Sequence, residues 1–106
     1  MSIIVLNVGG GRFVTRRDTL CLGFFSGLLN SLDEDETEVF IDRDPTHFRY
    51  ILNWLRGCRY VPKHSQQIQT ELLWEADFFG LDDLVTKLKT ARAYTYKDRY
   101  WNAEYK

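Results

Sequence analysis

Three consecutive glycines, Gly9 to Gly11, lie between two apolar runs near the start of the chain and raise the question of phosphate binding. A P-loop has the form GxxxxGK[ST], because its lysine and hydroxyl serve the phosphates and magnesium. Here Arg12-Phe13-Val14 follows and supplies neither group. The dinucleotide fingerprint opens a helix, whereas a strand-like segment follows these glycines. The triplet therefore predicts the turn of a hairpin and no nucleotide cofactor.

Residues that could bind a metal or catalyse a reaction are few and poorly spaced. Of the two cysteines and two histidines, only Cys58 and His64 lie near each other in sequence, and a proline separates them. Ser26 precedes a glycine, but no GxSxG elbow surrounds it. The sequence thus predicts no metal, no cofactor and no catalytic residues, and we expect a protein that is not an enzyme.

Two segments carry closely spaced charges that could serve an interface. "FIDRDP" (Phe40 to Pro45) places three alternating charges directly after an apolar run. The residues leave two interpretations open. Either Asp44 caps a helix and its neighbours are solvated, or Asp42 and Arg43 pair with charges of a neighbouring subunit, in head-to-tail contacts that close into rings. The acidic run from Asp33 to Glu38 is likewise either a solvated loop or a contact surface for a partner.

The composition favours one folded domain. The chain has 106 residues, of which 44% are hydrophobic and 15% aromatic. Fourteen basic and 15 acidic side chains give a net charge of -1. We therefore expect no nucleic-acid partner and no direct membrane contact, and no apolar run is long enough to span a bilayer. Two isolated cysteines without an export signal predict reduced thiols and a cytoplasmic location.

The first half of the chain predicts strands and a short helix. The apolar, β-branched segment 3–8 predicts a strand covered on both faces, and the alternating segment 12–16 predicts its hairpin partner. Segment 24–32 is apolar and helical in character. Segment 39–41 predicts a short buried strand.

The second half predicts three helices. In the first, Asp44 is expected to be the N-cap, Pro45 the first helical residue and Gly57 the residue after the C-cap. Its apolar face would comprise Phe48, Ile51, Leu52 and Leu55. Helices over 65–79 and from about Asp82 follow. After residue 93 the chain becomes aromatic and charged, so we expect a domain over 1–93 and a tail over 94–106.

Three blocks of sequence resemble one known family. "LNVGGGRFVTRRDTL", "FIDRDPTHFRYILNWLRG" and "ELLWEADFFGLDDLV" are similar, in this order, to the opening, central motif and closing helices of the potassium-channel tetramerisation type of BTB (POZ) domain. The blocks look closer to the soluble KCTD proteins than to voltage-gated channels. The alternative is the cytoplasmic tetramerisation domain of such a channel, because "YKDR" and "NAE" in the tail have a channel-like look.

The resemblance implies a compact α/β (α+β) fold, with a small three-stranded mixed sheet and about five helices. It also implies a homo-oligomeric ring of roughly four or five subunits. The matching interface residues are Phe13, Thr15, Asp42, Arg43, Asp44 and Arg49.

Many soluble members of the family are adaptors of cullin-3 ubiquitin ligases, which implies cullin-3 as a second partner. The stretch that would face the cullin runs from Phe24 to Asp35, although the family's usual "PDS" before its helix is absent here. The residues expected on this surface are Phe24, Phe25, Leu28, Leu29 and Asp33.

Overall fold

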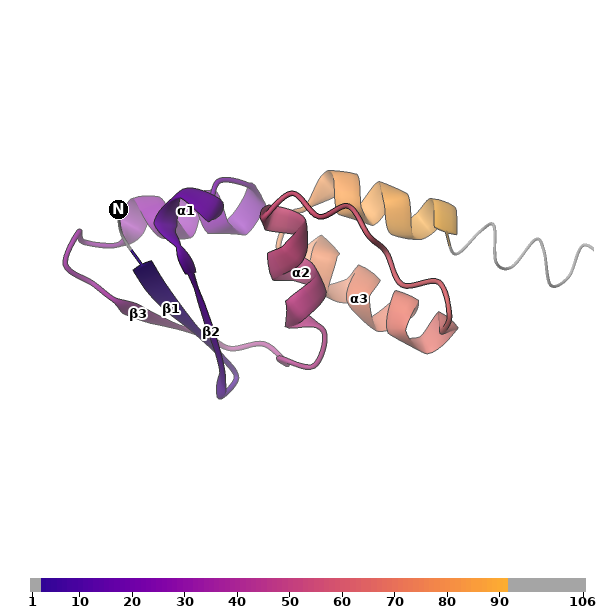
Figure 1. The fold of residues 1–106 in the computed structure, drawn as a ribbon, viewed down its shortest axis with the longest axis horizontal. Helices are drawn as coiled ribbons and strands as arrows, with labels where there is room; N and C mark the ends of the chain where they lie inside the picture. The colour runs from indigo at the N-terminus through magenta and orange to yellow at the C-terminus, as the bar shows by residue number, and fades with distance from the viewer. Residues whose placement is uncertain (1–2, 92–106) are drawn as a thin grey trace, which may run out of the picture.

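A β-hairpin opens the fold (Figure 1). In the computed structural model, which describes residues 3–91, β1 (Ile3–Val8) pairs antiparallel with β2 (Gly11–Arg16). The turn between them has Gly9 at φ 55° and Gly10 at φ 99°. Positive φ at both turn residues matches the twist of a hairpin and is easily adopted only by glycine. The prediction that the glycines form a hairpin turn is therefore confirmed.

A third strand completes a mixed sheet. The chain leaves β2 through a 3₁₀ turn, η1 (Arg17–Thr19), and the helix α1 (Gly23–Ser31). It returns as β3 (Glu38–Ile41), which lies parallel to β1, so the strand order is β2-β1-β3. A parallel pair needs such a crossover connection. The predicted three-stranded mixed sheet is confirmed.

Within residues 3–91, the helices cover only one face of this sheet. Along β1, Ile4, Leu6 and Val8 are buried, whereas Val5 and Asn7 on the opposite face are partly exposed. The expectation that β1 is covered on both faces was therefore wrong. The short strand β3 was also expected to be buried, but Phe40 on the open face is 61% exposed. This asymmetry could not be predicted from the pattern of apolar residues, because both faces of β1 and β3 carry apolar side chains.

The helix α2 (Phe48–Leu55) has the predicted apolar face and end. Phe48, Ile51, Leu52 and Leu55 are all buried. After the helix, Gly57 has φ 97°, and the Cys58 N–H donates to the Asn53 carbonyl at 2.9 Å, which closes a Schellman motif.

The predicted start of α2 was wrong. Its N-cap is His47, and Asp44 caps a separate turn by accepting a hydrogen bond from the Thr46 N–H at 2.9 Å. The Phe48 N–H closes that turn on the Pro45 carbonyl at 3.0 Å. The chain thus makes one turn before α2 begins. This turn places Arg43 and Pro45 against the hairpin turn between β1 and β2.

Two further helices complete the described chain. The helix α3 (Gln66–Phe78) begins at Ser65, whose hydroxyl accepts a hydrogen bond from the Ile68 N–H at 3.2 Å. A last helical segment covers residues 82–91. Residues 3–91 therefore contain four α-helices and one 3₁₀ turn, close to the expected number. The tail predicted over 94–106 lies outside the described residues.

Aromatic rings join the helices in the core. Phe25 of α1 stacks on Phe79, with 4.7 Å between ring centroids, and Phe48 of α2 meets Phe79 edge-on at 5.6 Å. All three rings are buried. Aromatic side chains of this size dominate the energetics of a core, so this cluster fixes α1 and α2 relative to the end of α3.

Candidate interaction surface

The hairpin turn packs directly against the loop that contains the FIDRDP motif. The Gly9 N–H donates to the Ile41 carbonyl at 2.9 Å. A Cβ on Gly9 would collide with the Arg43 carbonyl oxygen, and one on Gly11 would lie 2.7 Å from the Pro45 Cβ. The missing side chains therefore allow a close approach of two backbones, in addition to the turn itself.

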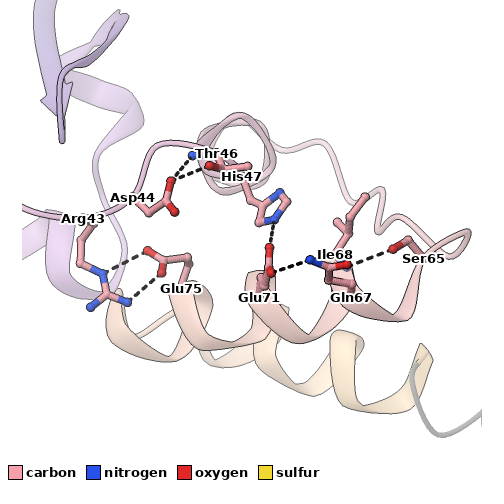
Figure 2. Close-up of polar contacts among 9 residues, drawn as sticks. All are labelled: Arg43, Asp44, Thr46, His47, Ser65, Gln67, Ile68, Glu71 and Glu75. Atoms are coloured by element: carbon pink, nitrogen blue, oxygen red, sulfur yellow. Dashed lines mark hydrogen bonds and ion pairs between the residues drawn. The ribbon is translucent and has the colours of Figure 1, made fainter.

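Arg43 is held by a carboxylate from α3 (Figure 2). Its Nε donates to Glu75 Oε1 at 3.1 Å and its Nη2 to Glu75 Oε2 at 2.8 Å. The two side chains are only 28% and 14% exposed. The guanidinium also lies 4.1 Å from the centroid of the Phe78 ring. A bidentate, partly buried pair of this kind fixes the loop firmly to α3.

A second polar contact joins the start of α2 to the same helix. His47 Nε2 donates to Glu71 Oε1 at 2.7 Å, and Gln67 Nε2 donates to the other oxygen of Glu71 at 3.1 Å (Figure 2). These hydrogen bonds stabilise the charged carboxylate, so they lower the pKa of Glu71, with the bond from His47 as the largest cause. The hydrogen bond from the Thr46 hydroxyl lowers the pKa of Asp44 in the same way.

The polar contacts in this region hold one segment of the chain in place and leave charged groups exposed. Within residues 3–91 no three His, Cys, Asp or Glu side chains are grouped closely enough to hold a metal ion. The described histidine–carboxylate pair, His47 and Glu71, has neither serine nor cysteine among its hydrogen-bond partners. The polar contacts instead fix the 42–47 segment against α3 and leave carboxylates at the surface, where another protein can reach them.

The predicted interface residues fall into two groups. Asp42, Asp44 and Arg49 are exposed. Phe13, by contrast, lies on the covered face of the sheet, where its ring centroid is 4.8 Å from that of Phe48. Thr15, on the same face, is 5% exposed. In the single chain, then, Asp42, Asp44 and Arg49 are available to a partner. Arg43 is engaged by Glu75, and the two members from β2 pack against the helices.

The residues predicted to face cullin-3 also differ in exposure, because they lie on different sides of α1 or just after it. Phe24 and Asp33 are exposed, and Leu28 and Leu29 are half-buried. Phe25 is fully buried on the other side of the helix. Direct contact with a partner is therefore left to the other four.

The acidic run that follows α1 is attached through its backbone. Arg17 Nη2 donates to the carbonyl oxygens of Asp33, Glu34 and Glu36. The acidic side chains of residues 33–38 are exposed. Both interpretations of the run, a solvated loop and a contact surface, fit this arrangement.

Sequence reasoning missed the contribution of α3. The buried residues along this helix and at its end, Leu72, Ala76 and Phe79, leave a second set of residues on its other sides. That set contains Glu71 and Glu75, which hold the loop, and the exposed aromatic residues Trp74 and Phe78. Their spacing of four along a helix was a usable signal, because such residues lie on one side.

None of the helices within the described residues is long and apolar enough to cross a membrane.

Comparison with known proteins agrees with the fold. The profile of the BTB/POZ domain matches residues 4–88. The chain is 48% identical over 95 residues to SH3KBP1-binding protein 1 of Mus musculus, covering 83% of this chain and 13% of that protein. It is 45% identical over 94 residues to BTB/POZ domain-containing protein KCTD3 of Homo sapiens, covering 82% and 11%.

A third relative is the BTB/POZ domain-containing adapter for CUL3-mediated RhoA degradation protein 2 of Mus musculus. The chain is 39% identical to it over 95 residues, which cover 83% of this chain and 30% of that protein. The chain thus spans less than a third of the length of each of these three relatives. The match of the profile to most of the chain, together with these relatives, shows that the chain belongs to the BTB/POZ domain family, of the KCTD-like type, and is a protein-interaction module rather than an enzyme.

Proposed function

We propose that this domain assembles with further copies of itself into a closed ring of roughly four or five subunits. The observation that carries the proposal is the rigid presentation of charge by the 42–44 loop. Asp42 and Asp44 are exposed beside Arg43, whose bidentate pair with Glu75 holds the loop in place. Arg49, of opposite charge, is exposed on α2. A fixed acidic surface and a separate basic residue are the elements of a head-to-tail polar contact.

Light scattering after size-exclusion chromatography tests the assembly. We expect the mass of a tetramer or pentamer at micromolar concentration. A protein that stays monomeric, or stops at a dimer, contradicts the ring.

We further propose that the ring acts as an adaptor for a cullin-3 ubiquitin ligase. Support comes from the relative that is named as an adapter for CUL3-mediated RhoA degradation. It also comes from α1, which leaves Phe24 exposed and Leu28 and Leu29 half-exposed, with Asp33 exposed just after the helix. Since the relatives are much longer than this chain, the substrate of such an adaptor is expected to bind a part of the protein outside this domain. A cytoplasmic location accompanies this role, and the exposed free thiols of Cys21 and Cys58 fit it.

Native mass spectrometry with and without the N-terminal part of cullin-3 tests the adaptor role and counts the subunits at once. We expect one cullin fragment per subunit. A matched pair of variants locates the contact: Leu28→Asp on α1 should abolish binding, whereas Thr90→Asp on the last helix should not. If the cullin fragment fails to bind the parent ring, the adaptor role is wrong and the assembly stands.

A potassium-channel tetramerisation domain is the second candidate. The adapter and KCTD names of the relatives favour the first candidate over it. The discriminating observation is whether the complete gene continues into six apolar segments of about 20 residues each.

A further inference from the structure

A pocket rich in positive charge lies where the segment between α2 and α3 passes beside the last helix (Figure 1). Its volume is about 400 Å³, and its lining residues are Arg59, Tyr60, Val61, Lys63, His64 and Lys87. Arginine and both lysines are charged at neutral pH, and no lining residue is acidic. Such a group stands out in a chain whose net charge is -1. We call it the cationic pocket.

Two of these cations are held close together. Arg59 Nη1 donates to the Trp54 carbonyl at 3.1 Å, and Lys87 Nζ donates to the Arg59 carbonyl at 2.6 Å. Both charged groups also lie near one ring, because the Arg59 guanidinium is 4.4 Å and the Lys87 ammonium 5.9 Å from the centroid of Trp54. Trp54 is buried and therefore supports them from a fixed position. The fold thus holds two like charges beside one another.

The backbone that carries the third cation is anchored as well. Val61 and Pro62 are buried, whereas Lys63 and His64 directly after them are exposed. The fully buried Gln69 of α3 donates through its Nε2 to the Pro62 carbonyl at 2.8 Å. A buried hydrogen bond of this kind is costly to break, so it fixes the backbone immediately before Lys63.

No carboxylate of the described chain neutralises the pocket. The ion pairs within residues 3–91 involve Arg12, Arg16, Arg43 and His47, none of which lines the pocket. Grouped like charges repel one another, and an anion that binds between them removes this repulsion. The cationic pocket is therefore suited to a compact ligand with more than one negative charge.

A phosphate monoester meets this requirement best. It carries a charge of about -1.5 to -2 near neutral pH and three strong acceptor oxygens. Arg59 and Lys87 each retain N–H donors beyond those used in the bonds above, and Tyr60 adds a hydroxyl to the pocket. A carboxylate has one charge and two oxygens, so it would satisfy fewer of these donors.

We propose that the cationic pocket binds a phosphorylated serine or threonine of a partner protein. A protein segment is favoured as the source of the phosphate, because the chain belongs to a family of protein-interaction modules. An anionic membrane is a poorer match, since the chain as a whole carries no excess of positive charge. The proposal depends neither on the ring nor on cullin-3. It adds a site at which phosphorylation of the partner controls its binding.

Binding of synthetic phosphopeptides to the full chain tests the proposal. The probe is a fluorescent pool of short peptides that have one central phosphoserine and randomised neighbours, and the same pool with serine is the reference. Fluorescence anisotropy in about 0.15 M sodium chloride measures both. We expect the phosphorylated pool to bind at least about tenfold more tightly, because the phosphate adds charge-assisted hydrogen bonds.

Three charge reversals locate the site. Lys63→Glu and Lys87→Glu place a carboxylate at the pocket, and each should weaken binding of the phosphorylated pool by at least about tenfold. Lys89→Glu makes the same change at an exposed residue of the same helix that does not line the pocket, and should alter binding by less than about twofold. If thermal unfolding shows that a pocket variant is unfolded, Lys63→Gln or Lys87→Gln replaces it and must still weaken binding.

Several results would overturn the proposal. Equal binding of the two pools, or no binding of the phosphorylated pool, shows that the pocket does not recognise phosphate on a protein segment. An equal loss in Lys89→Glu and the pocket variants attributes binding to overall charge. Inorganic phosphate that competes as strongly as the peptides assigns the site to a free anion. Vesicles with phosphatidylinositol 4-phosphate that bind the chain when the peptides do not assign it to a membrane.

Discussion

Arg43 links the loop of the FIDRDP motif to α3 through two of its three guanidinium nitrogens, Nε and Nη2. Because the pair with Glu75 is partly buried, loss of either charge leaves the other without its partner in a place that water reaches poorly. Residues near it, such as Asp42, are exposed and depend on this bond for their position. The pair therefore serves the fold first and any interface second.

We predict that Arg43→Met and Glu75→Gln each lower the free energy of unfolding by about 1–3 kcal/mol. The double variant should lose less than the sum, since the two changes remove one interaction. Urea unfolding of the four proteins measures this coupling. Arg12→Met is the control, because its exposed pair with Glu38 at 3.6 Å should contribute about 1 kcal/mol or less. Additive effects of the two changes would show that the pair is not coupled.

The partly buried pair of Arg43 and Glu75 also affects how a charge reversal at Arg43 should be interpreted. Arg43→Glu would place two carboxylates side by side within one chain, so a loss of assembly in that variant would report unfolding as much as interface chemistry. Arg49→Glu is the better probe of the interface, because Arg49 is exposed on α2.

Glu71 gives the fold a dependence on acid pH. Its pKa in the folded chain lies below the ordinary value of 4.5, mainly because His47 donates a hydrogen bond to it. A lowered pKa means that the unfolded chain takes up the proton first as the pH falls. The stabilisation is complete well above pH 4.5 and is lost as the pH falls below that value, through the pKa of the folded state.

We therefore expect the parent to lose more stability than Glu71→Gln between neutral pH and about pH 3, because the variant has no proton to bind there. Denaturant unfolding at a series of pH values compares the two proteins. Parallel stability curves for parent and variant would contradict a role for this carboxylate.

At the scale of elements, the start of α1 depends on one close contact. The Phe24 N–H donates to the Phe79 carbonyl at 2.8 Å, which brings the end of α3 against Gly23. Gly23 has φ 54°, and a Cβ there would collide with the Phe79 carbonyl oxygen. A second glycine of the same helix, Gly27, has no such neighbour within 4 Å.

The two glycines should respond in opposite ways to alanine. Gly23→Ala should cost about 2–4 kcal/mol, through the strained φ and the clash with backbone atoms. Gly27→Ala should stabilise the protein by about 0.5–1 kcal/mol, because alanine favours the helix interior. Thermal unfolding of both variants is the measurement. Equal effects at the two positions would contradict the importance of the contact between α1 and the end of α3.

At the scale of the whole molecule, assembly should respond to salt. The proposed contact between subunits joins Arg49 to the carboxylates of the 42–44 loop, and salt weakens the attraction between such exposed charges. We expect the dissociation constant of the ring to rise as sodium chloride is raised from about 0.1 M to 1 M, where the screening length falls from about 10 Å to 3 Å. Sedimentation equilibrium at several salt concentrations measures it. Tighter assembly at high salt would indicate a contact dominated by apolar surface instead.

Much of the fold could be predicted because its signals are local. The glycine triplet between apolar runs predicts a hairpin, the stripe from Phe48 to Leu55 predicts the buried side of α2, and Gly57 predicts where that helix ends. Each of these features depends on residues within one or two turns of one another. The order of the three family blocks added the mixed sheet, which single elements could not specify.

The tertiary structure determined which side chains are exposed at the surface and which charges are paired. Arg43 meets a partner 32 residues away, so no local pattern reveals that Glu75 holds it. Likewise, Phe24 and Phe25 are adjacent and equally apolar, yet one is exposed and the other fully buried by Phe79. The sequence alone determined the elements, because backbone geometry and hydrophobic periodicity act between near neighbours. Only the packing of distant elements determined which charges are neutralised and which aromatic rings remain free to bind, because burial depends on everything that surrounds a side chain in space.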